Sequence, residues 1–162
     1  MSDPYQDCEM AVQKILLDID DITDKLFKMD SVKLGDFRVL DGGYDRSCVI
    51  TPGPFVSNKI SEDVKSMVWL MNVEIYQRYK DAVQAFADFK HMRGKVINEL
   101  NSRPTLKLSG LVQIPGVQSV LVQAGGEPAF VSKENTNITT HIVQTLNLQI
   151  IQIVQTIGGE FA

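Results

Sequence analysis

The chain has 162 residues and a formal net charge of −4, and its length is typical of one folded domain. The acidic groups are concentrated near the start, because the first 30 residues hold eight acidic side chains and three lysines. No basic stripe is present that would grip a nucleic-acid backbone, so we expect no tight DNA binding. No apolar run reaches the roughly 20 residues of a membrane span, and the acidic N-terminus does not resemble a secretory signal.

A helix is expected over residues 4–28. Asp3, Pro4 and Gln6 have the pattern of an N-cap, a proline in the first turn and a capping box. The apolar positions that follow have the spacing of one helix face: Val12, Ile15, Leu16, Ile19, Ile22 and Leu26. The aspartates between positions 18 and 24 lack the glycine and glutamate of a calcium loop, so we interpret them as a solvated face.

The next segment is expected to form short strands and an exposed connection. Residues 37–40 and 48–51 are strand candidates, and the turn at 41–43 is rich in glycine. Pro52-Gly53-Pro54 should end the second strand at a corner or an edge, because proline donates no hydrogen bond to a sheet. Residues 56–66 have no clear period and are expected to form an exposed connection.

The stretch from Met67 to Pro104 predicts a strand that leads into a long helix. Trp69 belongs to a set of apolar residues with a period of two, which predicts that it lies in the core: Met67, Trp69, Met71, Val73 and Ile75. From Tyr79 to Leu100 the apolar residues change to helical spacing, with Asp81 in the first turn and Pro104 as the stop. No glycine-rich phosphate loop joins the two elements.

The last third predicts further strands. Candidates are residues 117–122, 129–131 and a long closing strand around 146–153. The polar residues 132–140 are expected to form a loop, and residues 158–162 a flexible tail.

The closing strand changes its side-chain parity. Ile151 and Ile153 point away from the face formed by Leu146, Leu148 and Ile150, which a straight strand with one buried face does not allow. Three explanations remain open: a bulge near Ile150, a helix over the second face, or a subunit interface on that face. Phe55, next to the Pro-Gly corner, is the candidate for a second patch. The candidate interface residues are therefore Phe55, Ile151 and Ile153.

No catalytic, cofactor or metal motif is visible. His91 and His141 have no sequence neighbours that suggest a catalytic or ligand set, and Cys8 and Cys48 lack ligand spacing, so we expect free thiols. A P-loop and a Gly-x-Ser-x-Gly motif are also absent from the sequence. We therefore expect a protein that is not an enzyme, with an enzyme assembled from distant residues as the alternative.

The order of these segments resembles a known family. After the acidic helix come the segments ITPGPF, VWLMNVEIYQRYKDAVQAFADFKHMRGKVINEL, VQAGGEPAF and HIVQTLNLQIIQIVQ. This order is similar to the tail terminator, or tail completion, proteins of long-tailed bacteriophages, and it covers nearly the whole chain. The resemblance implies an α+β fold over residues 1–162: a single domain with two main helices packed on a mostly antiparallel sheet.

The resemblance also implies a function. Six subunits would form a ring on the end of the tail tube, stop its growth and present a joining surface to the head-side connector. The implied partners are further copies of the chain, the tail tube protein and the head-completion or connector protein. DNA would pass without specific binding, and the ring would belong to the tail or neck of the virion after assembly in the host cytoplasm. The alternatives are another neck or head-completion protein, and a small cytosolic enzyme or ligand-binding domain.

Overall fold

The computed structural model describes residues 3–35, 43–107, 114–157 and 160–161. The helices are α1 (Pro4–Leu17), a short 3-10 helix (Met29–Ser31) and α2 (Ala82–Asn101). The strands are β1 (Val32–Leu34), β2 (Arg46–Lys59), β3 (Val64–Arg78), β4 (Val117–Ala124), β5 (Ala129–Ser132), β6 (Thr139–Ile157) and β7 (Glu160–Phe161).

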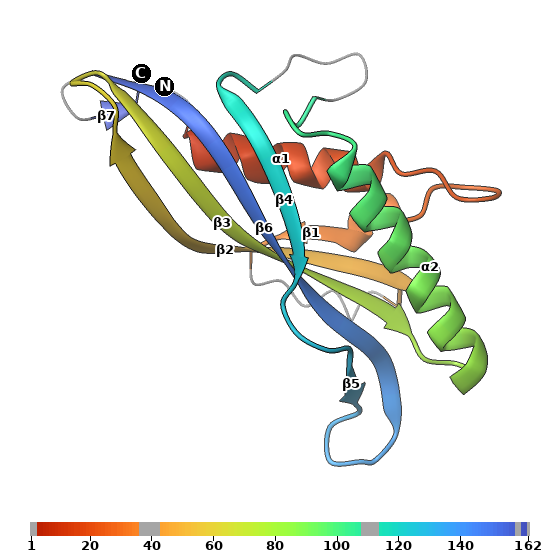
Figure 1. Cartoon of the computed structure of the whole chain (residues 1–162). Coiled ribbons are helices and arrows are strands. Elements are labelled where there is room, and N and C mark those ends of the chain that lie inside the picture. The colour runs from red at the N-terminus through yellow and green to blue at the C-terminus, as the bar shows by residue number, and fades with distance from the viewer. Residues whose placement is uncertain (1–2, 36–42, 108–113, 158–159, 162) are drawn as a thin grey trace.

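These elements form the predicted α+β fold, in which α1 and α2 pack on one face of a mostly antiparallel sheet (Figure 1). The strands lie in the order β1-β2-β3-β6-β4, and β5 and β7 also pair with β6. Only β1 is parallel to its neighbour, β2. In the described part of the chain, no helix is long and apolar enough to cross a membrane.

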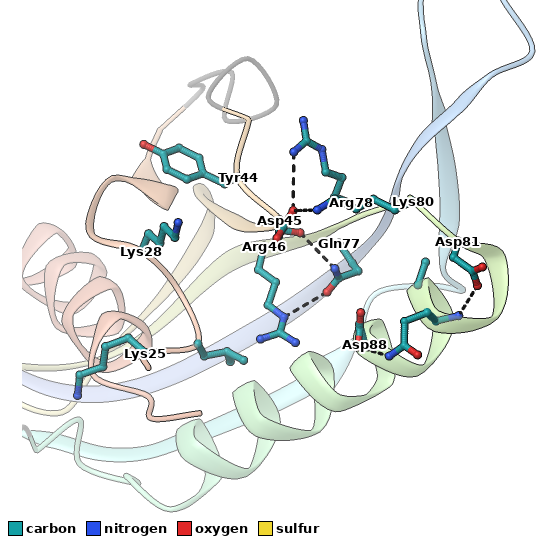
Figure 2. Close-up of a pocket in the computed structure, with 13 residues that line it drawn as sticks. Lys25, Lys28, Tyr44, Asp45, Arg46, Gln77, Arg78, Lys80, Asp81 and Asp88 are labelled. Carbon is teal, nitrogen blue, oxygen red and sulfur yellow. Dashed lines mark hydrogen bonds and ion pairs between the residues drawn. The ribbon is translucent and has the colours of Figure 1, made fainter. Parts of the chain in front are cut away.

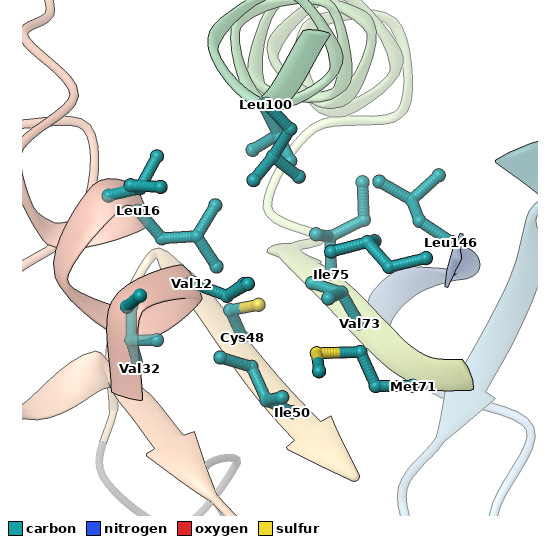
Figure 3. Packing of buried hydrophobic residues seen from close by; sticks show 14 of the residues in the cluster. Val12, Leu16, Val32, Cys48, Ile50, Met71, Val73, Ile75, Leu100 and Leu146 are labelled. Carbon is teal, nitrogen blue, oxygen red and sulfur yellow. The ribbon is translucent and has the colours of Figure 1, made fainter. Parts of the chain in front are cut away.

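The core lies between the two helices and the sheet (Figure 3). Every second residue of β3 is buried there, and the side chain of Trp69 is 3% exposed, which confirms its predicted position. Helix α2 contributes Phe89, Met92, Val96 and Leu100, and α1 contributes Val12, Ile15 and Leu16. Helix α2 begins at Ala82, later than the expected start at Tyr79, so Asp81 is its N-cap and does not lie in the first turn: its carboxylate accepts hydrogen bonds from the amides of Val83 and Gln84.

Helix α1 is shorter than the predicted range of 4–28. Asp3 caps it, but the helix ends at Leu17. The aspartates and β-branched residues that follow are weak helix formers, and carboxylates are unfavourable at the negative end of a helix. Leu26 and Phe27 are nevertheless buried, so the apolar pattern that suggested a helix comes from a loop folded onto the core.

The expected end of a strand at Pro52-Gly53-Pro54 is wrong. Strand β2 continues through these residues, and the register shifts between Pro52 and Phe55 so that two residues lie opposite Leu70. The hydroxyl of Tyr5, on α1, donates to the Leu70 carbonyl (2.9 Å) and accepts from the Gly53 amide (3.1 Å). A side chain from a distant element therefore satisfies the backbone groups at this bulge.

Four further expectations need correction or fall outside the described residues. Residues 56–66 form the distal part of the β2–β3 hairpin, not a connection. Strand β6 begins at Thr139, within the expected loop 132–140, and Glu160–Phe161 of the supposed tail pair with β6. The predicted strand at 37–40 lies outside the described residues.

Candidate functional site

The described residues hold no group of three His, Cys, Asp or Glu side chains placed to bind a metal ion. Cys8 and Cys48 are buried and free, in agreement with the expectation of free thiols. Burial raises the pKa of the Cys8 thiol to about 12, so this thiol is protonated at neutral pH. It is a weak nucleophile for that reason.

The two histidines lie on different elements, and each is surrounded by other residues of the fold. His91, on α2, is not simply solvated: its Nε2 lies 2.8 Å from Oδ1 of Asp21. Arg46 donates to the other oxygen of Asp21 at 2.7 Å, and the bonds from His91 and Arg46 lower the pKa of Asp21 to about 2. His141 is buried on β6, where loss of solvation lowers its pKa. The Asp21 network therefore links the loop after α1 to α2 and β2.

A polar cleft of about 310 Å³ lies beside this network, between the loop after α1 and the start of α2 (Figure 2). Its charged lining residues are Lys25, Lys28, Asp45, Arg46, Arg78, Lys80, Asp81 and Asp88. Most of the cations are paired within the chain: Lys80 and Arg78 contact Asp45, at 2.9 and 3.7 Å. The hydrogen bond from Lys80 is the main cause of the lowered pKa of Asp45.

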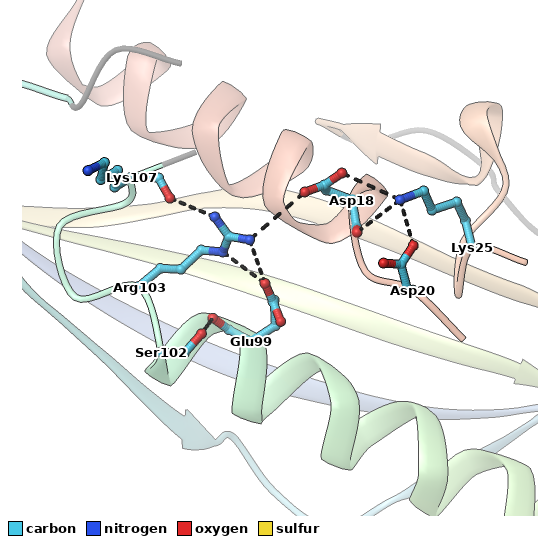
Figure 4. Close-up of polar contacts among 7 residues, drawn as sticks. All are labelled: Asp18, Asp20, Lys25, Glu99, Ser102, Arg103 and Lys107. Atoms are coloured by element: carbon cyan, nitrogen blue, oxygen red, sulfur yellow. Dashed lines mark hydrogen bonds and ion pairs between the residues drawn. The ribbon is translucent and has the colours of Figure 1, made fainter. Parts of the chain in front are cut away.

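Ion pairs also join the ends of the two helices (Figure 4). The Nζ of Lys25 lies 2.7 Å from a carboxylate oxygen of Asp20 and 3.5 Å from one of Asp18. The Nη2 of Arg103 lies 2.6 Å from a carboxylate oxygen of Glu99 and 3.9 Å from one of Asp18. Asp18, Asp20 and Asp21 thus have basic partners of their own chain. The cleft and these pairs are best described as polar packing that surrounds the core.

The parity change in β6 is real, and no bulge in β6 explains it. Strands β3 and β6 pair without a register shift from Val64–Gln155 to Arg78–His141. The nearby shift belongs to β4, between Val117 and Ser119. Ile151 and Ile153 therefore lie on the face of the sheet opposite the helices, which we call the open face.

Among the described residues no helix covers the open face, so the second explanation is also wrong (Figure 1). The apolar residues at its centre come from three adjacent strands and are partly exposed: Val68, Leu70, Leu121, Ile151 and Ile153. A hollow of about 280 Å³ crosses the same strands and adds polar groups to the surface: Asn72, Gln123, Asn147 and Gln149. The open face is therefore a mixed surface with an apolar centre.

Gln152 occupies the position on the helix side that an apolar residue would normally fill. It is buried, its Oε1 accepts from the indole Nε1 of Trp69 (2.8 Å), and its Nε2 donates to the Pro115 carbonyl (2.8 Å). A buried indole N–H needs such a partner. The sequence did not lead us to predict the role of Gln152, although a buried Trp indicates that a hydrogen-bond partner is needed.

The distal part of the β2–β3 hairpin, residues 55–63, is called the hairpin arm. Phe55 is 60% exposed and Val56 is 51% exposed. Phe55 lies on the helix side, where its ring centre is 5.7 Å from that of Trp69. The predicted residues thus form two separate patches, with Phe55 on the arm and the two isoleucines on the open face.

No family model matches the chain, and no curated protein sequence matches it.

Proposed function

We propose that this chain is a structural virion protein that forms a ring of six subunits on the end of a phage tail tube. The ring terminates tail growth and provides the joining surface for the head-side connector. The observation that carries this proposal is the uncovered open face, where Ile151 lies opposite Val68 and Ile153 follows on the same side of β6. Contiguous exposed apolar surface usually marks a contact between proteins.

The distribution of the apolar groups supports a ring in particular. A cyclic assembly needs two different patches that fit each other, and the chain has apolar groups on the open face and the exposed Phe55 on the helix side of the hairpin arm. The partners in this proposal are further copies of the chain, the tail tube protein and the head-completion or connector protein. The protein would act without a cofactor or catalysis, in the tail or neck of a virion assembled in the host cytoplasm, and DNA would pass without specific binding.

A ligand-binding domain is the alternative, and the cleft in Figure 2 is the feature that favours it. The pairing of most of its cations with acids of the same chain leaves little free charge for a ligand. Oligomeric state separates the two functions. Analytical ultracentrifugation should give a mass about six times the 18.1 kDa of one chain, and electron microscopy should show rings. A monomer at every concentration would contradict the proposal, and so would a tail tube that keeps growing when the rings are added.

The open face can be tested with the double substitution Ile151→Asp and Ile153→Asp. We expect a folded subunit that no longer assembles, because two carboxylates would lose their hydration in the interface. The matched control places the same charges at Ile22 and Val83, which are strongly exposed on other elements. Circular dichroism and light scattering decide the result. Loss of folding would place the two isoleucines in the core of the subunit, and rings in the double mutant would show that the open face is not the interface.

A further inference from the structure

The two edges of the sheet differ in how far they are protected from pairing with another strand. At one edge, β1 covers only Cys48–Ile50 of β2, and Pro52 and Pro54 have no N–H to offer. The longest stretch of β2 that is neither covered by β1 nor interrupted by proline is in the arm, from Phe55 to Lys59. At the other edge, β4 pairs with β6 and with no other strand of the described residues.

Strand β4 lacks the usual protection of an edge. From Ser119 to Ala124 it has no proline, no charged side chain and no register shift. Natural edge strands normally have at least one of these features, because an unprotected edge is a template for another strand. This edge is therefore suited to accept a strand.

We propose that β4 of one subunit pairs antiparallel with Phe55–Lys59 in β2 of a second copy, so that the sheet continues from subunit to subunit. This inference rests on the ring proposed above and adds a strand junction at the sheet edges to the contact on the open face. Because β2 and β4 lie at opposite edges of the sheet, the junction joins two different surfaces and can repeat around a ring.

Strand direction is the first argument for this pairing. Strands β2 and β3, β3 and β6, and β6 and β4 are all antiparallel, so β2 and β4 run in opposite directions within one subunit. Neighbours in a ring have the same orientation relative to the ring axis. When the sheet continues across the junction, β2 of one copy therefore meets β4 of the next in the antiparallel sense.

The level of the two segments in the sheet is the second argument. Phe55 pairs with Trp69, Trp69 with Ile150, and Ile150 with Val120, so one row crosses the sheet from the arm to β4. Neighbours in a closed ring are related by rotation without translation along the axis. The joined edges must then lie at the same level, apart from the stagger that strand tilt introduces. Phe55 and Val120 meet this condition.

Side-chain chemistry is the third argument. Val56 belongs to the open face, in the row of Val68, Ile151 and Ser119, and it is 51% exposed. With a stagger of two residues from that row, as strand tilt introduces, Val56 lies beside Leu121 of the next copy, whose side chain is 47% exposed on the same face. The junction would cover both groups and join the apolar centres of neighbouring open faces.

The test uses two variants with charges on exposed positions. The β4 variant is Leu121→Lys with Gln123→Lys, and the arm variant is Val56→Lys with Asn58→Lys. Lysine on an edge strand opposes pairing, whereas threonine at the same four positions serves as the neutral control and should keep the rings. We expect ultracentrifugation to show that each lysine variant has the mass of one chain.

Mixing the two lysine variants is the decisive step. The intact arm of the β4 variant can still pair with the intact β4 of the arm variant, so an equimolar mixture should have twice the mass of one chain and form no ring. A mixture that stays monomeric would overturn the inference. So would an arm variant that still dimerises, because that result indicates pairing of β4 with β4.

The remaining outcomes separate the inference from the function on which it rests. Rings in both lysine variants would overturn the edge pairing and leave the ring intact, whereas a monomeric wild-type chain would overturn both. Hydrogen exchange on the wild type gives a readout that needs no folded variant. Amides of β4 and Phe55–Lys59 should exchange more slowly in the ring than in the diluted monomer, and equal rates would contradict the pairing.

Discussion

Replacing Tyr5 with Phe removes one hydroxyl group and tests how the sheet tolerates Pro52-Gly53-Pro54. The hydroxyl makes two hydrogen bonds, to the Leu70 carbonyl (2.9 Å) and from the Gly53 amide (3.1 Å). A hydrogen bond contributes about 0.5–1.5 kcal/mol net to stability. Both groups are only partly buried and water can replace part of the loss, so we expect the free energy of unfolding to fall by ~1–2 kcal/mol.

Urea denaturation followed by circular dichroism, at one fixed protein concentration, measures this loss. Tyr79→Phe is the matched control, because the Tyr79 hydroxyl makes no hydrogen bond with any residue that the structure describes. The Gly53 amide should also exchange faster with solvent in Tyr5→Phe. Equal stabilities of the two variants, together with an unchanged Gly53 exchange rate, would refute the proposed role of Tyr5 at the bulge.

Three further outcomes are expected. Trp69→Ala should lower the free energy of unfolding by about 3–5 kcal/mol, because it empties a large buried site. The fluorescence emission of native Trp69 should be blue-shifted, and a solvent-like spectrum would count against its burial. The pKa of Asp21 is lowered to about 2 in the folded chain, so its ion pairs stabilise the fold at any pH above its unfolded pKa. This contribution is lost as the pH falls from about 4 towards 2. Urea titrations in that range should therefore show that the stability of Asp21→Asn depends less on pH than the stability of the wild type. Fluorescence anisotropy with duplex DNA at near-physiological salt should show no binding at micromolar protein, and tight, salt-sensitive binding would indicate a DNA-handling protein instead.

The candidate interface shows how far sequence reasoning reached. The opposite orientation of Ile151 and Ile153 followed from a period of two, which is a local property of an extended chain. Whether a helix covered them depended on where α1 and α2 pack, which no local pattern reveals. The arm and the β4 edge were missed for a related reason: the prolines of β2 suggested an end to the strand, and an edge is defined only by the position of a strand in the sheet.

The sequence by itself determined the elements whose signals lie within a few residues of each other. Examples are β3 with the buried Trp69, α2 with its Asp81 cap, and the parity of β6. Only the tertiary structure decided where α1 ends, how β2 passes its prolines and which face of the sheet remains open. Side-chain periodicity and capping are short-range effects, whereas the partners that satisfy a bulge or cover a face come from elements far away in the chain. Tyr5 and Gly53 are such a pair: 48 positions separate them, and one hydrogen bond joins them.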